Sequence, residues 1–352
     1  MESIIDQSKA IRTGEELPIE KINDWIKTQI PDLDGFTEVT QFSGGASNWT
    51  YRLKYNNYDL ILRRPPAGTK ATSAHDMKRE YEIQKALKPF FPVPKMYCFC
   101  NDPAIIGCDF YIMERVEGII PRSNLPKGLN LSIPQTRELC INMIDKLIEL
   151  HKIDIQNTGL DKIGKGTGYA QRQIDGWSSR FEKSKTWNVP DCKKVIYWLK
   201  NNVPKEEHTC LIHNDYRFDN LILATEEPSK IIGVLDWEMA TIGNPLMDLG
   251  NTLAYWVEEA DDFIAKSTRR QPTNAKGMLK RKEVLAYYCQ KMNLEGLNFT
   301  FYEVYGLFRL VVILQQIYYR FHHKQTNNPA FKNFWILVHY LNWRCKRIIK
   351  NQ

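Results

Sequence analysis

Two short apolar runs in the second half of the chain, each followed by polar side chains, constrain its fold more than any other feature. The first run, 210–212, leads into Asp215 and Asn220, and the second, 231–235, leads into Asp236. Apolar runs of this length, bounded by polar residues, are typical of buried strands. We therefore expect buried strand ends to present these polar groups at one site.

The residue types at this site suit phosphoryl transfer. Kinase catalytic loops place an aspartate five residues before an asparagine, and a metal-binding aspartate follows a short hairpin. Asp215 can accept a hydrogen bond from a hydroxyl and align its oxygen on a γ-phosphorus. Asn220 and Asp236 carry the oxygen ligands that Mg²⁺ prefers. We predict these three as the catalytic residues and the last two as metal ligands, and we expect His213 to support the loop through hydrogen bonds.

Length and composition indicate a globular protein with two domains or lobes. The chain has 352 residues, of which 43% are hydrophobic and 25% charged. The net charge of +7 comes from basic residues spread along the chain, without the clustered stripe of nucleic-acid-binding proteins. We expect a cytoplasmic protein with reduced thiols, no signal peptide, and neither a nucleic acid nor a membrane as partner.

The first third of the chain alternates between apolar and polar residues, as antiparallel strands do. The expected strands are 37–42, 48–53, 58–63, 95–100 and 109–114. Helical spacing predicts a leading helix at about 18–30 and a second helix at 74–87.

Beyond residue 120 the pattern becomes helical. The first helix there, 134–153, is preceded by Ser132 as its cap. Further helices are expected at 169–184, 191–201, 247–259, 278–292, 301–322 and 330–349.

These elements predict an α+β fold with two lobes. A nucleotide-binding lobe, 1–115, would hold a small antiparallel sheet with one main helix. A larger, mainly helical lobe, 116–352, would carry the catalytic loop 211–220 and the metal site at Asp236. The hinge would lie at 115–120.

A phosphate-covering loop is predicted between the first two strands. The loop contains two glycines and two residues with short side chains, so its backbone N–H groups can approach an anion. These residues are Gly44, Gly45, Ser47 and Asn48. A plain hairpin turn is the alternative.

Arg63 ends the third strand, where kinases carry a lysine that contacts phosphates and pairs with a helix glutamate. Its guanidinium fork matches phosphate geometry. Glu80 is the expected partner and Glu82 the competitor. Arg64 should point to the opposite face of the strand, into solvent.

The fifth strand leads into the hinge. The Glu114 carbonyl and the Val116 amide are expected to hydrogen-bond adenine, and Met113 should line the depth of the pocket.

In this order, the segments resemble the aminoglycoside phosphotransferase family, which shares the protein-kinase-like fold. The match is closer to the subgroup that forms the kinase-like domain of certain acyl-CoA dehydrogenase fusions and also occurs as stand-alone bacterial proteins. The resembling segments are 42–48, 62–68, 79–81, 110–118, 213–220, 236–238, 243–250 and 302–309.

The resemblance implies ATP as phosphate donor, Mg²⁺ as cofactor, Asp215 as base and Asp248 as a brace of the catalytic loop. It also implies that four helix residues face the substrate: Tyr169, Arg172, Gln173 and Trp177. Asn214 departs from the family, which usually has glycine there, but asparagine tolerates left-handed backbone.

We therefore expect an ATP-dependent small-molecule kinase that phosphorylates an alcohol group. The subgroup resemblance implies a hydroxyacyl-CoA or hydroxy-acid-like acceptor. Alternatives are an aminoglycoside-, macrolide- or choline-type kinase and a nucleotide-binding pseudokinase that acts as a binding module. The acidic segment 258–262 would suit a polycation, but Lys266, Arg269 and Arg270 follow it. A protein kinase is disfavoured because no Ala-Pro-Glu segment follows Asp236.

Overall fold

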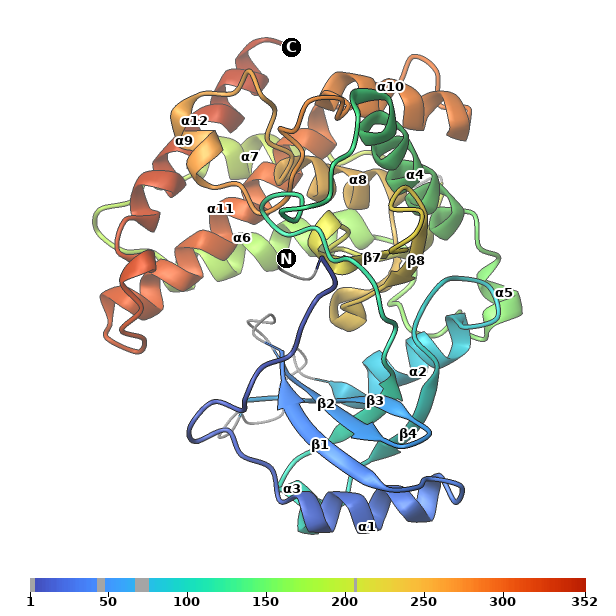
Figure 1. Cartoon of the computed structure of the whole chain (residues 1–352). Coiled ribbons are helices and arrows are strands. Elements are labelled where there is room, and N and C mark those ends of the chain that lie inside the picture. Colours follow the sequence, from blue (N-terminus) through green and yellow to red (C-terminus); the bar gives the residue numbers. More distant parts are fainter. Residues whose placement is uncertain (1–3, 43–47, 67–75, 206–207) are drawn as a thin grey trace.

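The computed structural model describes residues 4–42, 48–66, 76–205 and 208–352. It has a β-rich N-terminal lobe, at the bottom of Figure 1, and a larger helical lobe above it. The N-terminal elements are α1 (Ile19–Gln29), β1 (Phe36–Gln41), β2 (Trp49–Tyr55), β3 (Asp59–Arg64), α2 (Met77–Leu87), β4 (Met96–Cys100), α3 (Pro103–Ile106) and β5 (Phe110–Glu114). The predicted α+β class is confirmed, and the expected strands and the two main helices of this lobe are present.

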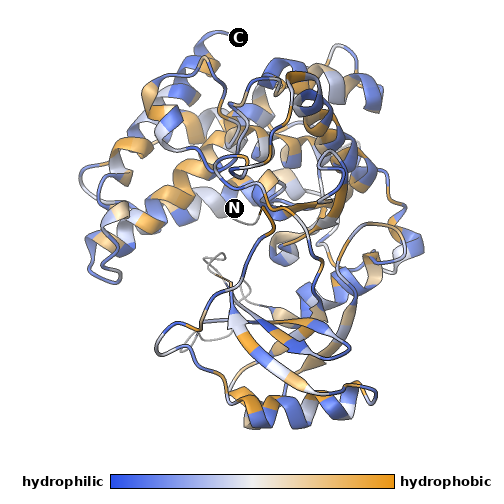
Figure 2. Cartoon of the chain, viewed as in Figure 1, coloured by the Kyte–Doolittle hydropathy of each residue, from blue (hydrophilic) through white to orange (hydrophobic). Residues whose placement is uncertain are grey.

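The five strands form one antiparallel sheet in the order β1-β2-β3-β5-β4. Alternate residues of β2, such as Tyr51 and Leu53, face α1 and pack in one apolar cluster with its Ile22 and Ile26. In Figure 2 the ribbon of α1 carries both hydrophobic and hydrophilic residues, as an amphipathic helix does. The other face of the sheet packs against α2. The central strand β3 is therefore covered on both sides.

Arg64 corrects one expectation from the sequence. It does point away from Arg63, but only 9% of it is exposed. Its guanidinium lies 5.4 Å from the ring centre of Trp49, its cross-strand partner, and its Nε donates to the Pro65 carbonyl. The prediction was wrong because it took the second face of a central strand to be solvent-exposed.

The helical lobe contains α4 to α12 and four short strands. Its elements are α4 (Ile133–His151), α5 (Ile155–Thr158), α6 (Tyr169–Ser184), α7 (Lys193–Asn201), β6 (Cys210–Ile212), β7 (Leu221–Leu223), β8 (Ile231–Val234), β9 (Thr241–Gly243), α8 (Pro245–Ala254), α9 (Phe263–Ser267), α10 (Arg281–Met292), α11 (Thr300–His322) and α12 (Phe334–Lys350). The predicted capping role of Ser132 is confirmed, since it forms a capping box with Gln135.

The predicted helix 247–259 has the wrong bounds. The Asn244 side chain accepts hydrogen bonds from the Leu246 and Met247 N–H groups, so α8 begins earlier. The helix ends at Ala254, and the Val257 N–H donates instead to the Thr273 hydroxyl.

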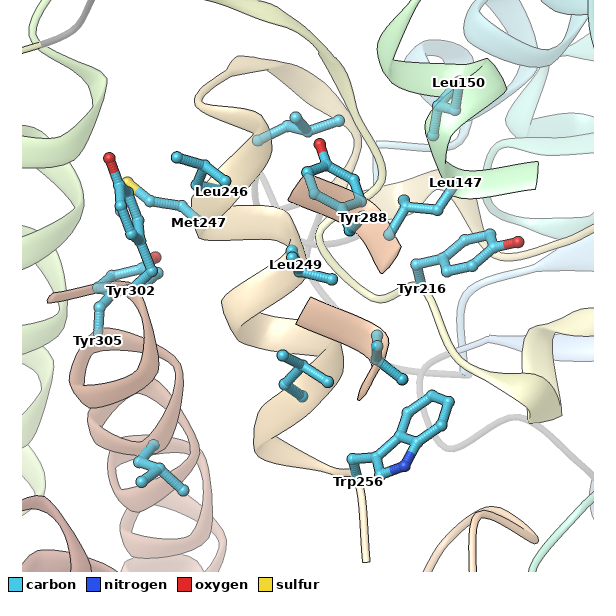
Figure 3. Close-up of a cluster of buried hydrophobic side chains, with 14 of the residues drawn as sticks. Leu147, Leu150, Tyr216, Leu246, Met247, Leu249, Trp256, Tyr288, Tyr302 and Tyr305 are labelled. Atoms are coloured by element: carbon cyan, nitrogen blue, oxygen red, sulfur yellow. The ribbon is translucent and has the colours of Figure 1, made fainter. Parts of the chain in front are cut away.

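Helix α8 lies between α4 and α11 in the core of this lobe, where Leu249 packs among the side chains of Figure 3. Its backbone touches that of α11. A Cβ atom on Gly306 would lie 2.2 Å from the Gly250 carbonyl oxygen, and one on Gly250 would lie 2.4 Å from the Tyr302 carbonyl oxygen. Only glycine fits at either position, so this contact fixes α8 and the residues that it carries.

None of the helices in the described ranges is both long and apolar enough to span a bilayer. The eight cysteines are free thiols.

Candidate active site between the two lobes

The hairpin of β7 and β8 positions the two predicted metal ligands. Asn220 directly precedes β7 and Asp236 lies just beyond β8, so both leave the same end of the hairpin. The Leu235 N–H donates to the Asn220 carbonyl at 2.8 Å and closes this end. Two buried strand ends thus bring these side chains together. The second apolar run of the sequence is β8, whereas the first is β6, which precedes Asp215 and pairs with β9 instead.

Asp215 and Asn220 are joined directly. The Asn220 Nδ2 donates to the Asp215 carbonyl oxygen at 2.8 Å and to its Oδ2 at 3.3 Å. With the amide nitrogen engaged in this way, the amide oxygen is left as the acceptor atom of Asn220. That oxygen is the atom that a hard cation would bind.

Arg217 orients the Asp215 carboxylate. Its Nη1 lies 3.2 Å from Asp215 Oδ1, its Nε donates to Asp219 at 2.9 Å, and its guanidinium stacks 4.7 Å from the ring centre of Tyr255. About a fifth of the Asp215 side chain is exposed. The carboxylate is therefore held at the surface of the cleft in a defined orientation.

His213 and Asp248 hold the loop from behind, and both are fully buried. Asp248 accepts the backbone N–H groups of His213 at 2.8 Å and Asn214 at 2.7 Å, and lies 3.1 Å from His151 Nε2. Burial alone would raise the pKa of Asp248, but His151 and His213 hold it below the usual value. His213 lies 3.0 Å from the Leu235 carbonyl through Nε2, so it links the two motifs.

Asn214 has a left-handed backbone with φ of 65°. Its side chain accepts hydrogen bonds from the Tyr169 hydroxyl and the Asn251 amide, both at 3.1 Å, and donates to the Met239 carbonyl at 3.0 Å. The side chain therefore adds bonds that a glycine could not make.

Arg63 connects the N-terminal lobe to Asp236, one of the two predicted metal ligands. Its Nη1 lies 3.2 Å from the Glu80 carboxylate, and its Nη2 donates to Asp236 Oδ1. Glu82 is exposed, so Glu80 is the partner. Burial raises the pKa of Glu80, although the Arg63 charge opposes the shift. At Asp236 burial also acts to raise the pKa, but Arg63 outweighs it, so the pKa of Asp236 is lowered.

One pocket runs from the hinge to these residues. Its walls are Phe42, Thr50 and Ile61 from the sheet, Met113, Glu114 and Val116 from the hinge region, Ile222 and Leu235 from the hairpin, and Arg63, Asn220 and Asp236 at the end. Among the described residues, the Val116 N–H has no hydrogen-bond partner. The pocket thus joins an apolar slot to a polar end.

The loop residues predicted to cover the phosphates are divided. Gly44, Gly45 and Ser47 lie outside the described residues. Asn48 is buried, and its Nδ2 donates to Glu238 Oε2 at 3.1 Å. This bond connects the N-terminal lobe to the segment that follows Asp236.

The four helix residues expected to face the substrate have different surroundings. Tyr169 is buried against Asn214, and the Arg172 guanidinium donates to carbonyls just before α6. Trp177 is buried and donates to Gln173 Oε1 at 3.1 Å. Tyr169 and Arg172 therefore make structural contacts within the helical lobe.

Sequence reasoning assigned no role to Arg309 or Tyr255. Arg309 is 5% exposed and lies 5.3 Å from the ring centre of Trp177. No described residue accepts a hydrogen bond from its guanidinium or forms an ion pair with it. Burial raises the pKa of Tyr255, and Arg217, Arg309 and Arg270 oppose the shift. The sequence did offer one indication of a role for Arg309, because this residue ends 302–309, a segment that carries the family resemblance.

The donor set fits Mg²⁺. Asp236 supplies a carboxylate and Asn220 an amide oxygen, and Mg²⁺ is usually held by one or two carboxylates together with substrate phosphates. Consistent with this sparse type of site, the described ranges contain no group of three or more His, Cys, Asp or Glu side chains placed to hold a metal.

The sequence pattern of the phosphotransferase enzyme family matches residues 38–283. Acyl-CoA dehydrogenase family member 10 of Mus musculus is 33% identical over 321 residues, which are 90% of this chain and 30% of that protein. Acyl-CoA dehydrogenase family member 11 of Rattus norvegicus is 33% identical over 84% of this chain and 38% of that protein. The chain thus spans about a third of the length of these curated relatives.

Among solved structures, a proposed aminoglycoside phosphotransferase from Ralstonia eutropha JMP134 superimposes with a TM-score of 0.79 at 27% identity, covering 96% of this chain and 99% of that one. The ternary complex of aminoglycoside phosphotransferase APH(4)-Ia with AMP-PNP and hygromycin B has a TM-score of 0.57 at 13% identity, covering 94% and 98% of the two chains. These likenesses confirm the predicted kinase-like fold.

Proposed function

The chain belongs to the phosphotransferase enzyme family, and we propose that it transfers the γ-phosphate of ATP to a hydroxyl group of a small molecule. The observation that carries the proposal is that Asn220 and Asp236 line the end of one pocket whose other end is the hinge, and that Asp215 is hydrogen-bonded to Asn220 there. We also propose that the boundary between the nucleotide-binding lobe, 1–115, and the helical lobe, 116–352, lies at this hinge.

In this proposal Asp215 is the general base. Its carboxylate accepts the proton of the acceptor hydroxyl while the hydroxyl oxygen forms a bond to the γ-phosphorus and the bond to ADP breaks. Arg217 keeps the carboxylate aimed at the cleft. Asn220 and Asp236 would hold Mg²⁺, which supplies charge compensation on the phosphates. Arg63 would contact the phosphates, braced by Glu80.

The apolar end of the same pocket would take the adenine ring. The Val116 N–H and the Glu114 carbonyl are the groups that would recognise its edge, with Met113 lining the pocket. A complex of AMP-PNP with a protein of the same fold supports a nucleotide as the ligand.

An anionic hydroxylated acceptor fits the residues around Asp215 better than a cation. Arg309 is buried without an anionic partner among the described residues, and its charge acts on Tyr255 together with those of Arg217, Arg270 and the Asp215 carboxylate. A buried guanidinium without a carboxylate is costly unless a ligand pairs with it. The names of the relatives refer to acyl-CoA, so a hydroxyacyl-CoA or hydroxy acid is the acceptor class that we favour.

The acidic segment 258–262 gives little support to an aminoglycoside-type acceptor. Arg281 forms ion pairs with both Glu258 and Asp261, and Asp262 accepts a hydrogen bond from Tyr340. Two of the four carboxylates of this segment are therefore already paired with a cation, which reduces the negative surface that it offers to a polycation. The complete set of Asp215, Asn220 and Asp236 likewise argues against a pseudokinase.

A screen of ATP consumption tests the proposal, with amino sugars, choline-like alcohols, hydroxy acids and hydroxyacyl-CoAs as acceptors and the Asp215→Ala variant as the blank. We expect hydroxy acids or hydroxyacyl-CoAs to raise consumption above the blank. Turnover of amino sugars alone would contradict the acceptor class. Nucleotide binding without turnover of any acceptor would contradict the enzyme and support the pseudokinase.

A further inference from the structure

The residues that precede the first helix cross from one lobe to the other. We call residues 4–9 the N-terminal strap. Figure 1 shows this part of the chain starting beside the helical lobe and running to the sheet. The Asp6 N–H donates to the Gly118 carbonyl at 3.2 Å, and Lys9 exchanges two backbone hydrogen bonds of 2.8 Å with Gln41 of β1. The strap is thus fastened on both sides of the hinge.

The strap also forms part of the pocket between the lobes. Asp6 lines this pocket together with Gly118, Ile120 and Arg122, which follow the adenine-facing hinge residues in the sequence. Both oxygens of the Asp6 carboxylate accept from one nitrogen of Arg122, at 3.1 and 3.2 Å. The remaining lone pairs of the carboxylate are free to accept further hydrogen bonds.

Asp6 lines the pocket beside Gly118, which follows the adenine-facing residue Val116 in the sequence. If adenine lies against Val116 and the phosphates against Arg63, the ribose lies between them at the mouth of the pocket. Ribose offers two neighbouring hydroxyl donors, for which a carboxylate is the strongest side-chain acceptor.

The other carboxylates that line the pocket are already engaged. Asp219 accepts two hydrogen bonds from Arg217, Asp236 pairs with Arg63, and Glu114 accepts the Lys95 N–H. Asp6 is engaged as well, by Arg122, and its exposed fraction of 23% is similar to that of Asp219 and Asp236. It differs from them in its place, because its backbone N–H bonds Gly118, just beyond the hinge residue Val116, and no other role is proposed for its carboxylate. It is therefore the pocket carboxylate that we assign to a ribose hydroxyl.

We propose that the N-terminal strap belongs to the nucleotide site and that the Asp6 carboxylate accepts a hydrogen bond from a ribose hydroxyl of the bound nucleotide. This inference rests on the proposed function, because it needs a nucleotide in the pocket. It adds a recognition residue from a segment outside 38–283, the residues that match the family pattern. Arg122 is the positioning residue that orients Asp6.

Isothermal titration calorimetry of the full chain tests this without requiring turnover. The ligands are ATP, 2′-deoxy-ATP and 3′-deoxy-ATP, and the proteins are the wild type, Asp6→Asn and the control Asp24→Asn, which alters an exposed aspartate of α1. We expect the wild type and the control to bind ATP about tenfold more tightly than at least one deoxynucleotide. Asp6→Asn should bind ATP about tenfold more weakly and lose that preference.

Two results would overturn the inference while leaving the phosphotransferase proposal intact: equal binding of all three nucleotides by the wild type, or an unchanged preference in Asp6→Asn. A wild type that binds none of the nucleotides would overturn both proposals. Arg122→Gln adds a second arm. If Arg122 positions Asp6, this variant should prefer ATP over the deoxynucleotides less strongly than the wild type does. If the strap acts only as a tether through its backbone, the preference should not change.

Discussion

Replacing Asp248 by asparagine should weaken both the fold and the catalytic loop. The carboxylate is fully buried, and its two oxygens serve three donors: the His213 and Asn214 N–H groups and His151 Nε2, at 2.7 to 3.1 Å. Asparagine has the same shape but only one acceptor oxygen. Its amide nitrogen must then face at least one backbone N–H, which loses its partner.

The magnitude follows from that lost bond. A hydrogen bond to a charged group contributes about 1.5–3 kcal/mol, and a buried donor left without an acceptor costs about 1–3 kcal/mol. We expect Asp248→Asn to lower the free energy of unfolding by roughly 2–4 kcal/mol, which most domains survive. Displacement of Asp215 by about 1 Å would also reduce kcat by about a hundredfold.

Urea unfolding followed by circular dichroism measures the first effect, and the rate of phosphoryl transfer measures the second. Asp161→Asn is the matched control, because Asp161 is exposed in the same lobe. If the free energies of unfolding of Asp248→Asn and of this control differ by less than about 0.5 kcal/mol, the carboxylate does not hold the catalytic loop and our reasoning is refuted.

The same substitution should change how stability depends on pH. The pKa of Asp248 is lower in the folded chain than its usual value of 3.8. Its stabilising contribution is therefore fully present above pH 3.8 and is lost as the pH falls below that value towards the folded-state pKa. Asp248→Asn should lose stability less steeply than the wild type in this acidic range, and an equal slope would contradict the assigned pKa direction.

Two further variants test the packing of the helical lobe and the acceptor site. Gly306→Ala should lower the free energy of unfolding by about 3 kcal/mol or more in urea titrations, because its Cβ would meet the Gly250 carbonyl. The control Gly176→Ala should be neutral or stabilising, because the atom nearest to its Cβ would lie 3.6 Å away. Equal effects of the two substitutions would argue against the contact between α8 and α11. Arg309→Gln should raise KM for an anionic acceptor about tenfold or more and leave KM for ATP within twofold; an unchanged acceptor KM in initial-rate assays would exclude Arg309 from the acceptor site.

Local patterns predicted the parts of the fold that local physics determines. Alternation located the five strands, and the two apolar runs located β6, which precedes Asp215, and β8, which precedes Asp236. The motif spacing also identified two residues that lie together, Asp215 and Asn220. They belong to one short loop and are joined by a hydrogen bond, so a local pattern was enough to find them.

Features that depend on distant segments were missed. The short strand β9 pairs with β6 through only three residues, too few to give a periodic signal. Arg64 is buried because Trp49 from another strand covers it. The roles that we propose for Arg309 and Asp6 depend on tertiary contacts: α11 brings Arg309 towards Tyr255, and the strap brings Asp6 to Gly118.

The most direct test of the central claim compares phosphoryl transfer by the wild type and Asp215→Asn, with Mg²⁺-ATP affinity measured on the same samples. We predict that kcat falls by about 10²–10⁴-fold while the dissociation constant for ATP changes less than twofold, because Asp215 acts on the acceptor hydroxyl and not on the nucleotide. An Asp215→Asn variant that turns over at the wild-type rate would contradict the account.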